Sequence, residues 1–294
     1  MRISILLLGA AICFAQETPQ GQLAHFHHVH LNVTDPAAAI AFYTSTFDCE
    51  KASFAGIQNA VWAQKSWLLF SKVAMPPKSE VTSAIWHIGW GAEEMQATYR
   101  KQLDMGTQFE TPLTDISDLV GSKEPGVFFY AYVDGPNHQL IELNTANHHH
   151  FGHIHMLSKD PIAAGEWYIK EFGLTRLGRG TPSREPHMYK GFQVGPSMSL
   201  MMDNVNIIIF PMEYAKTQWP ELWKNRTDFE STRGHTVDHI GFGVDNLDET
   251  LARLRNDGVT VNGVFQDGIK IGAAFIEGPD HVSIELLEGQ AHKE

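Results

Sequence analysis

Histidine and glutamate recur in this chain at positions that correspond between its two halves. A strand-like stretch beginning with histidine occurs four times, in the order HVHL, HIGW, HIHM and HIGF. Each half also closes with a stretch that carries a glutamate, GPNHQLIEL in the first and GPDHVSIEL in the second. Neutral imidazole and carboxylate groups bind divalent first-row metal ions. The sequence therefore predicts metal binding by His28, His87, Glu142, His153, His239 and Glu285.

The first and third of these stretches each contain a second histidine, two residues after the first. Because side chains on a strand alternate between its faces, His30 and His155 are expected beside His28 and His153. Two roles are open for them. They could act as acid–base groups next to a metal ion, or they could be buried polar residues bonded to a neighbour.

The order of the repeated stretches indicates a two-part unit that is duplicated in tandem. Each of the four modules reads as a strand, a helix and two or three further strands, which predicts an α+β fold. Asp35-Pro36 and Asp160-Pro161 predict helix starts, with Asp as the cap and Pro in the first turn. An insert at 212–234 is too long for a simple connection and is expected to form a lid or the edge of a pocket.

These motifs resemble the vicinal oxygen chelate superfamily, which includes glyoxalases, bleomycin- and fosfomycin-resistance proteins and type I extradiol dioxygenases. The resemblance rests on the histidine-bearing strands, the Asp-Pro helix starts and the GP[ND]HxxIEL endings. It implies four βαβββ modules paired into two curved-sheet barrels, module one with two and module three with four. The corresponding domains are 25–147 and 148–290, after a flexible lead-in at 16–24.

The resemblance also implies how the ligands are grouped. The two sets it implies, one in each half, are His28, His87 and Glu142, and His153, His239 and Glu285. Two histidines and one carboxylate suit Fe(II) best, with Mn(II), Ni(II) and Zn(II) as alternatives. Glyoxalase-like members usually add a ligand from the last strand of a module. The stretches 68–71 and 207–210 offer none, which favours a three-ligand site.

One tyrosine matches a residue of the extradiol enzymes. Tyr132 falls where those enzymes carry an active-site tyrosine, which can donate a hydrogen bond to a substrate oxygen. An ordinary inward-facing aromatic residue is the competing interpretation. The further histidine that extradiol enzymes usually carry before this strand is absent, so proton transfer by that route is not expected.

The function predicted from these features is that of a metal-dependent enzyme, most like an extradiol ring-cleavage dioxygenase, acting on a small molecule with adjacent oxygens. A glyoxalase-like lyase or isomerase and a non-enzymatic small-molecule or metal-binding protein remain alternatives. A formal net charge of −12 and the lack of basic runs argue against a nucleic-acid partner. The oligomeric state is left open by the sequence.

The first fifteen residues, MRISILLLGAAICFA, have the form of a signal peptide: an early arginine, a short apolar run and small residues before the cleavage point. The apolar run is shorter than the roughly 20 residues that a membrane-spanning helix needs. Export to the periplasm or the medium is therefore expected, with no membrane attachment after cleavage. Only Cys49 would remain, so no disulfide can form within the mature chain.

Export predicts that the protein isolated from its native host begins near Gln16, because cleavage is expected after Ala15. Mass spectrometry of the intact protein measures this directly. A soluble cytoplasmic protein that retains Met1 would contradict export.

Overall fold

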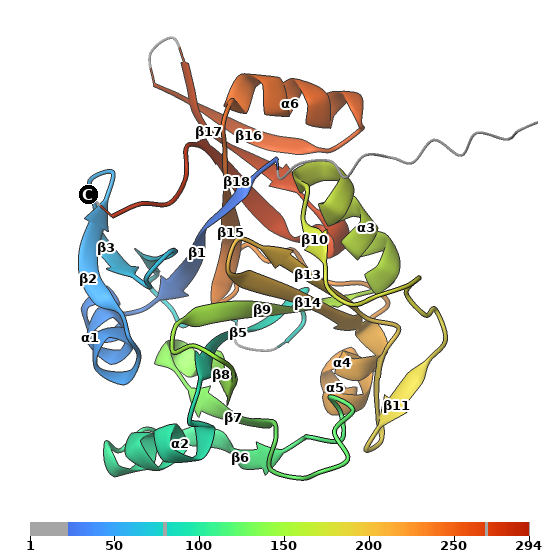
Figure 1. The fold of residues 1–294 in the computed structure, drawn as a ribbon. Coiled ribbons are helices and arrows are strands. Elements are labelled where there is room, and N and C mark those ends of the chain that lie inside the picture. Colours follow the sequence, from blue (N-terminus) through green and yellow to red (C-terminus); the bar gives the residue numbers. More distant parts are fainter. Residues whose placement is uncertain (1–22, 79–80, 268–269, 294) are drawn as a thin grey trace, which may run out of the picture.

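The computed structural model describes residues 23–78, 81–267 and 270–293, so the predicted signal peptide lies outside the described residues. The chain has the predicted α+β fold, built from four consecutive modules (Figure 1). Module one contains β1 (His25–Val33), α1 (Pro36–Thr46), β2 (Glu50–Phe54), β3 (Ile57–Trp62) and β4 (Trp67–Lys72). Module two contains β5 (Ile85–Ala92), α2 (Met95–Asp104), β6 (Phe109–Asp115), β7 (Phe129–Asp134), the short helix η1 (Pro136–His138) and β8 (Leu140–Thr145).

The second half of the chain repeats this order and adds the insert. Module three contains β9 (Phe151–Ser158), α3 (Pro161–Phe172), β10 (Thr175–Arg176), β11 (His187–Tyr189), β12 (Phe192–Gly195), β13 (Met198–Met202) and β14 (Val205–Pro211). The insert contributes α4 (Met212–Gln218) and α5 (Pro220–Trp223). Module four contains β15 (Val237–Val244), α6 (Leu247–Asn256), β16 (Val261–Asp267), β17 (Lys270–Glu277), η2 (Pro279–His281) and β18 (Ser283–Glu288). Among the helices of the described residues, none combines the length and apolarity needed to cross a membrane.

Both predicted Asp-Pro helix starts are confirmed. The Asp35 carboxylate accepts hydrogen bonds from the backbone N–H groups of Ala37 and Ala38 at 3.0 and 3.1 Å. Asp160 caps α3 in the same way. These bonds satisfy N–H groups that have no partner within the helix. Each cap thus fixes the point at which the chain leaves the first strand of its module.

The strands form two eight-stranded sheets, and each sheet takes one module from each half of the chain. The first sheet has the order β16-β17-β18-β15-β1-β4-β3-β2, and the second has the order β10-β13-β14-β9-β5-β8-β7-β6. Module one therefore pairs with module four, and module two with module three (Figure 1). The predicted pairing of modules one with two and three with four is wrong. The domain boundaries 25–147 and 148–290 divide the sequence into its two repeats and remain a prediction.

The pairing prediction failed because the first strands of all four modules are chemically similar. Each is a mainly apolar strand that could pair with any of the others, so the repeat alone does not determine which two modules share a sheet. In the structure β1 lies antiparallel to β15, and β5 lies antiparallel to β9. Modules two and three, which form one sheet, are joined by the short connection 146–150.

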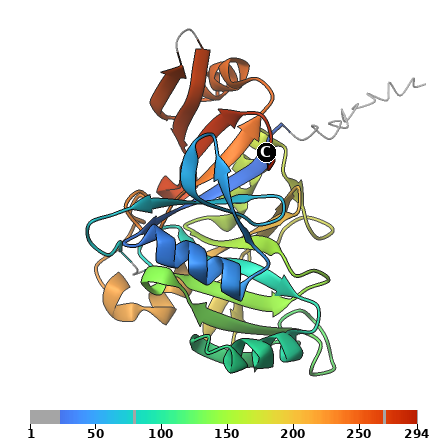
Figure 2. The ribbon, with the colours of Figure 1, turned by 90° about the vertical axis from the view of Figure 1, so that its left-hand side faces the viewer.

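Within each half, the modules contact each other through a helix rather than through a sheet. The Phe47 ring at the end of α1 stacks on Trp90 of β5, with ring centroids 4.4 Å apart. In the second half, Phe172 of α3 packs edge-on against Phe242 of β15 at 5.1 Å. Figure 2 shows α1 lying across the strands of module two. The two sheets therefore share one continuous apolar core, with the buried Phe26 and Phe151 rings 5.7 Å apart.

Candidate metal centres

The strand pairing gathers the six predicted ligands into two clusters, but not into the predicted sets. Centre I is the cluster of His28 on β1, His239 on β15 and Glu285 on β18. Its residues meet because β15 lies between β1 and β18 in the first sheet.

Centre II is the cluster of His87 on β5, His153 on β9 and Glu142 on β8. Here β5 lies between β9 and β8 in the second sheet. The grouping by sequence halves is wrong for the same reason as the module pairing, because each centre combines residues from both halves.

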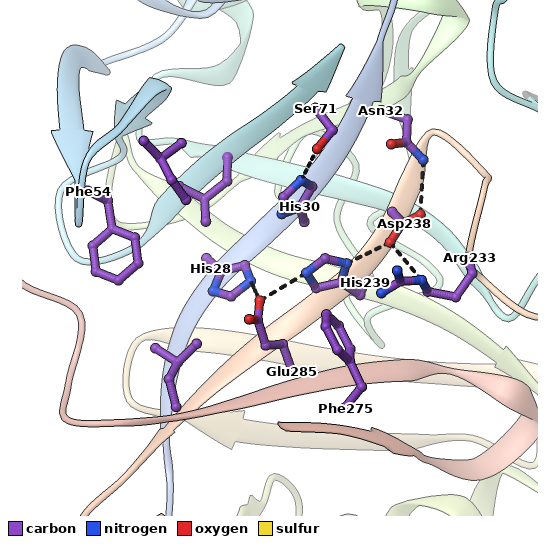
Figure 3. A pocket seen from close by; sticks show the side chains of 13 residues that line it. His28, His30, Asn32, Phe54, Ser71, Arg233, Asp238, His239, Phe275 and Glu285 are labelled. Atoms are coloured by element: carbon purple, nitrogen blue, oxygen red, sulfur yellow. Dashed lines mark hydrogen bonds and ion pairs between the residues drawn. The ribbon is translucent and has the colours of Figure 1, made fainter. Parts of the chain in front are cut away.

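In centre I, one carboxylate oxygen faces two imidazole nitrogens. Oε2 of Glu285 lies 3.2 Å from Nε2 of His28 and 3.2 Å from Nε2 of His239 (Figure 3). Both imidazoles are buried, whereas the carboxylate borders a pocket. Burial raises the pKa of Glu285, but hydrogen bonds to the two imidazoles outweigh burial and lower it. The carboxylate is therefore ionised and directed at the same point as the two nitrogens.

A third side chain holds His239 in the orientation that a ligand needs. Nδ1–H of His239 donates to Oδ1 of Asp238 at 2.7 Å. Asp238 also accepts a hydrogen bond from the side-chain amide of Asn32 at 3.0 Å (Figure 3). The backbone N–H of Gly234 donates to the same carboxylate at 2.8 Å. Hydrogen bonds to Asp238 and Glu285 outweigh burial and raise the pKa of His239, so the protonated ring can donate from Nε2 to Glu285. A divalent ion could take the place of the proton on Nε2 between His239 and Glu285, while Asp238 continues to fix Nδ1–H, so the geometry suits a metal ion.

Asp238 was not predicted as a functional residue. The register of β1 and β15 shifts between His30 and Leu31, which leaves Asp238 as an extra residue on β15. Such a bulge re-aims side chains, and here Asp238 and His239 both reach the centre. The signal available in the sequence was an acidic residue directly before one of the repeated histidines.

Centre II has the same donor set with a different environment. Oε2 of Glu142 lies 2.9 Å from Nε2 of His87 and 3.9 Å from Nε2 of His153. Both nitrogens are buried without a well-formed hydrogen bond to any described residue. Burial lowers the pKa of His153 to about 4, so this imidazole is neutral at neutral pH and has a lone pair to offer. The residue before His87 is Trp86 rather than an aspartate, and Nδ1 of His87 has no hydrogen-bond partner among the described residues.

Two glycines make room for the ligand rings and were also missed. Gly241 lies opposite His28, and a Cβ atom added to it would lie 2.0 Å from the imidazole of His28. Gly89 lies opposite His153, where an added Cβ would lie 1.9 Å from that ring. The repeated HIG motif was the signal. Its histidine is a candidate ligand, and its glycine makes room for the candidate ligand of the facing strand.

The structure places an apolar side chain where a fourth protein ligand could stand. The glutamates occupy positions paired with Gly241 and Gly89 in the parallel strand pairs. The matching positions beside β1 and β9 are Leu69 and Ile208. Both of these side chains line the pockets at the centres. Each centre therefore offers three protein ligands with an open apolar side.

His30 of β1 and His155 of β9 lie next to the candidate ligands, but their rings are not directed at the position where the ligand atoms converge. The His30 ring stacks on His239 with centroids 4.5 Å apart, and its Nε2 is hydrogen-bonded to Oγ of Ser71 at 2.7 Å. Nitrogens of His28, His30 and His239 lie within 4.8 Å of one another. A ring stacked flat on a ligand ring does not point at the same ion, however, so Glu285 is the better third ligand.

His155 lies 4.9 Å from the His87 ring and is buried, with no hydrogen-bond partner for Nε2 among the described residues. Tyr132 is paired with Glu142 across β7 and β8, and its ring lies 5.1 Å from that of His87. Burial and the Glu142 charge raise the pKa of Tyr132 well above its ordinary value. Its hydroxyl is therefore protonated at neutral pH and can act as a hydrogen-bond donor.

The pockets at the two centres differ in size and chemistry. The pocket at centre I has a volume of about 320 Å³ and a mixed wall, in which Arg233, Asp238, His30 and Ser71 lie beside apolar side chains such as Leu69. The pocket at centre II has a volume of about 590 Å³ and is walled mainly by aromatic and aliphatic side chains. Similar donor sets thus face different ligand environments.

Gly241→Ala and Gly89→Ala should each reduce metal binding at one centre only, because the added methyl group displaces the facing ligand ring. We expect a loss of affinity of at least 10-fold, the lower limit for disturbing a ligand's surroundings. Competition titration with a chelating dye measures this. Gly263→Ala is the matched control, since an added Cβ there meets only the Phe265 ring at 3.9 Å. Equal affinity in all three variants would contradict the ligand assignment.

Comparison with known proteins agrees with this architecture. The sequence model of the Glyoxalase/Bleomycin resistance protein/Dioxygenase superfamily matches residues 25–119 and 150–286. No curated protein matches the chain. Two structures of glyoxalase I from Zea mays, one of a mutant, align with TM-scores of 0.65 and 0.63 at 11% identity, and cover 91% and 90% of this chain and 94% and 92% of theirs.

A protein from Bacillus subtilis named as a proposed dioxygenase aligns with a TM-score of 0.55 at 13% identity, over 92% of this chain and 86% of its own. At these identities the structural likeness establishes the fold. The fold, its two repeats and the family match together show that the chain belongs to the Glyoxalase/Bleomycin resistance protein/Dioxygenase superfamily.

Proposed function

We propose that the chain is an exported metal-dependent enzyme, most like an extradiol ring-cleavage dioxygenase, and that turnover takes place at centre II. The observation that carries this proposal is the donor set of that centre. Two buried imidazole nitrogens and one carboxylate oxygen converge there, and neither nitrogen has a well-formed hydrogen bond within the described part of the chain. The ligand atoms of His87, Glu142 and His153 lie within 4.8 Å of one another, close enough for one ion to draw them together.

The residues of centre II would hold a divalent ion, and Fe(II) fits this donor set best. When bound, such an ion supplies coordination positions for adjacent substrate oxygens and dioxygen and a route for electrons between them. Ile208, which corresponds to Leu69 of centre I, has an apolar side chain and therefore leaves one side of centre II free of protein ligands. The mainly apolar wall on that side offers water few hydrogen-bond partners, and a substrate that displaced this water would strengthen electrostatic interactions within the site.

Two further residues give this pocket the means to control a proton. Burial lowers the pKa of His155 well below its ordinary value, so the ring is neutral but weakly basic, and it could take a proton only from a substrate hydroxyl that a bound divalent ion had made more acidic. Tyr132 remains protonated and can donate a hydrogen bond to the resulting oxygen anion. This assigns His155 the role of base and Tyr132 that of anion stabiliser.

The proposed reaction is balanced without another reductant. A substrate carrying hydroxyl groups on adjacent ring carbons reacts with one molecule of dioxygen. One carbon–carbon bond next to the hydroxyl-bearing carbons is cleaved, and both oxygen atoms enter the ring-opened product. The substrate is oxidised and dioxygen is reduced in the same step.

Centre I favours a second candidate function, a glyoxalase-like isomerase or lyase. Proton transfer between adjacent carbons needs a base close to the substrate, and centre I offers Glu285 and His30 in the wall of the smaller pocket. Hydrogen bonding between His30 and Ser71 gives that imidazole a neighbour through which a proton can pass. This candidate requires turnover without oxygen consumption.

Protein loaded with Fe(II) under anaerobic conditions should consume oxygen when a panel of catechols is added. Glu142→Gln keeps the shape of the side chain but removes the anionic ligand, so oxygen uptake should fall by at least 100-fold. Glu285→Gln is the matched control at centre I and should leave uptake within about threefold of the parent. Both rates are measured with an oxygen electrode.

Three outcomes would contradict the proposal. Uptake that depends on Glu285 rather than Glu142 would place the reaction at centre I. Turnover of a 2-oxoaldehyde–thiol adduct with bound nickel or zinc, without oxygen uptake, would favour the glyoxalase-like function. Tight binding of ligands with no turnover would identify a binding protein.

A further inference from the structure

The insert gives centre II a wall that centre I lacks. Tyr214 of α4 and Trp219, between α4 and α5, line the larger pocket. The Tyr214 ring lies 4.5 Å from that of Trp86, and Trp219 meets Trp86 edge-on at 5.9 Å. Trp86 in turn lies 4.5 Å from the ring of His87. A continuous aromatic surface therefore leads from the insert to a candidate metal ligand.

The parts of the wall next to Tyr214 are also aromatic. Phe192 of β12 packs on Tyr214 at 5.3 Å, and Phe210 of β14 lies 5.9 Å from the same ring. Tyr130 and Phe128 contribute from the other side of the pocket. The pocket at centre II, with a volume of about 590 Å³, is larger than that at centre I, with about 320 Å³, and has room for more than a small polar ligand.

The insert is fixed in place by a tryptophan that does not face the pocket. Trp223 of α5 is 3% exposed, and its indole N–H donates to the backbone oxygen of Val81 at 3.0 Å. Its ring also packs on Phe229 at 5.1 Å. These contacts tie the insert to the connection between modules one and two, so Tyr214 and Trp219 are held as a preformed surface.

We propose that Tyr214 and Trp219 determine specificity at centre II, and that the pocket takes aromatic ligands of two or more fused rings with adjacent ring oxygens at one end. A single ring would leave much of the apolar wall against water that finds few polar partners. A second ring would cover this wall and gain contact with flat aromatic faces. This inference rests on the proposed function for the oxygens at the metal end, whereas the ring preference follows from the pocket wall alone.

The ring preference can be tested without metal or turnover. Isothermal titration calorimetry on the metal-free full chain would compare 2-naphthol with phenol, neither of which can chelate through adjacent oxygens. We expect the parent to bind 2-naphthol at least 10-fold more tightly, because the second ring buries additional apolar surface. Tyr214→Leu and Trp219→Leu keep apolar bulk but lose the flat faces, and each should reduce this preference to about threefold or less.

Leu222→Ala is the matched control, because Leu222 lies in the same insert, is 38% exposed and does not line the pocket. It should keep the parent's preference, and thermal melts should show that all three variants are folded. Equal affinity of the parent for both ligands, or an unchanged preference in both pocket variants, would overturn the inference. Oxygen uptake with single-ring catechols in that case would leave the proposed function standing, whereas a ring preference without uptake would refute only the function.

Discussion

Antiparallel pairing between the first strands of two modules is the constraint on which both centres depend. In this pairing His28 faces Gly241 across β1 and β15, and His153 faces Gly89 across β9 and β5. The glycine provides the space, and the histidine two residues before it is the second candidate ligand. A parallel neighbour, β18 or β8, then brings the glutamate to the same point. Three strands therefore suffice to build each ligand set, and the rest of the fold keeps those strands in register.

The helices and turns provide that support from the convex side of the sheets. The side chain of Asn137 in η1 accepts a hydrogen bond from the backbone N–H of Thr34 at 3.0 Å, and Asp280 in η2 is bonded by Ser158 at 2.6 Å. Arg253 of α6 pairs with the buried Glu171 of α3 at 2.7 Å. These contacts join modules within a half, whereas strand pairing joins modules across halves. Each centre is consequently held by contacts with the whole chain rather than by one sequence domain.

The sequence was sufficient to predict the module repeat, the Asp-Pro helix starts and the positions that converge on the two centres. These follow from local patterns, namely strand alternation, cap chemistry and the repeated histidines. The partners could not be predicted, because four similar first strands allow more than one pairing. Asp238 was missed since its direction depends on a bulge, which arises from the register of two strands far apart in the chain. The roles of Gly89 and Gly241 likewise become visible only when the facing ring is known.

The central claim is that each centre joins residues from both halves, and metal stoichiometry of double variants tests it most directly. The parent should hold about two ions per chain. His28→Gln with Glu285→Gln removes two ligands of centre I and should leave a single ion, held at centre II. His28→Gln with Glu142→Gln damages both centres and should leave almost none. Elemental analysis of folded, equally purified proteins would give these values. The reverse pattern, in which the second pair of changes spares one ion and the first spares none, would contradict the account.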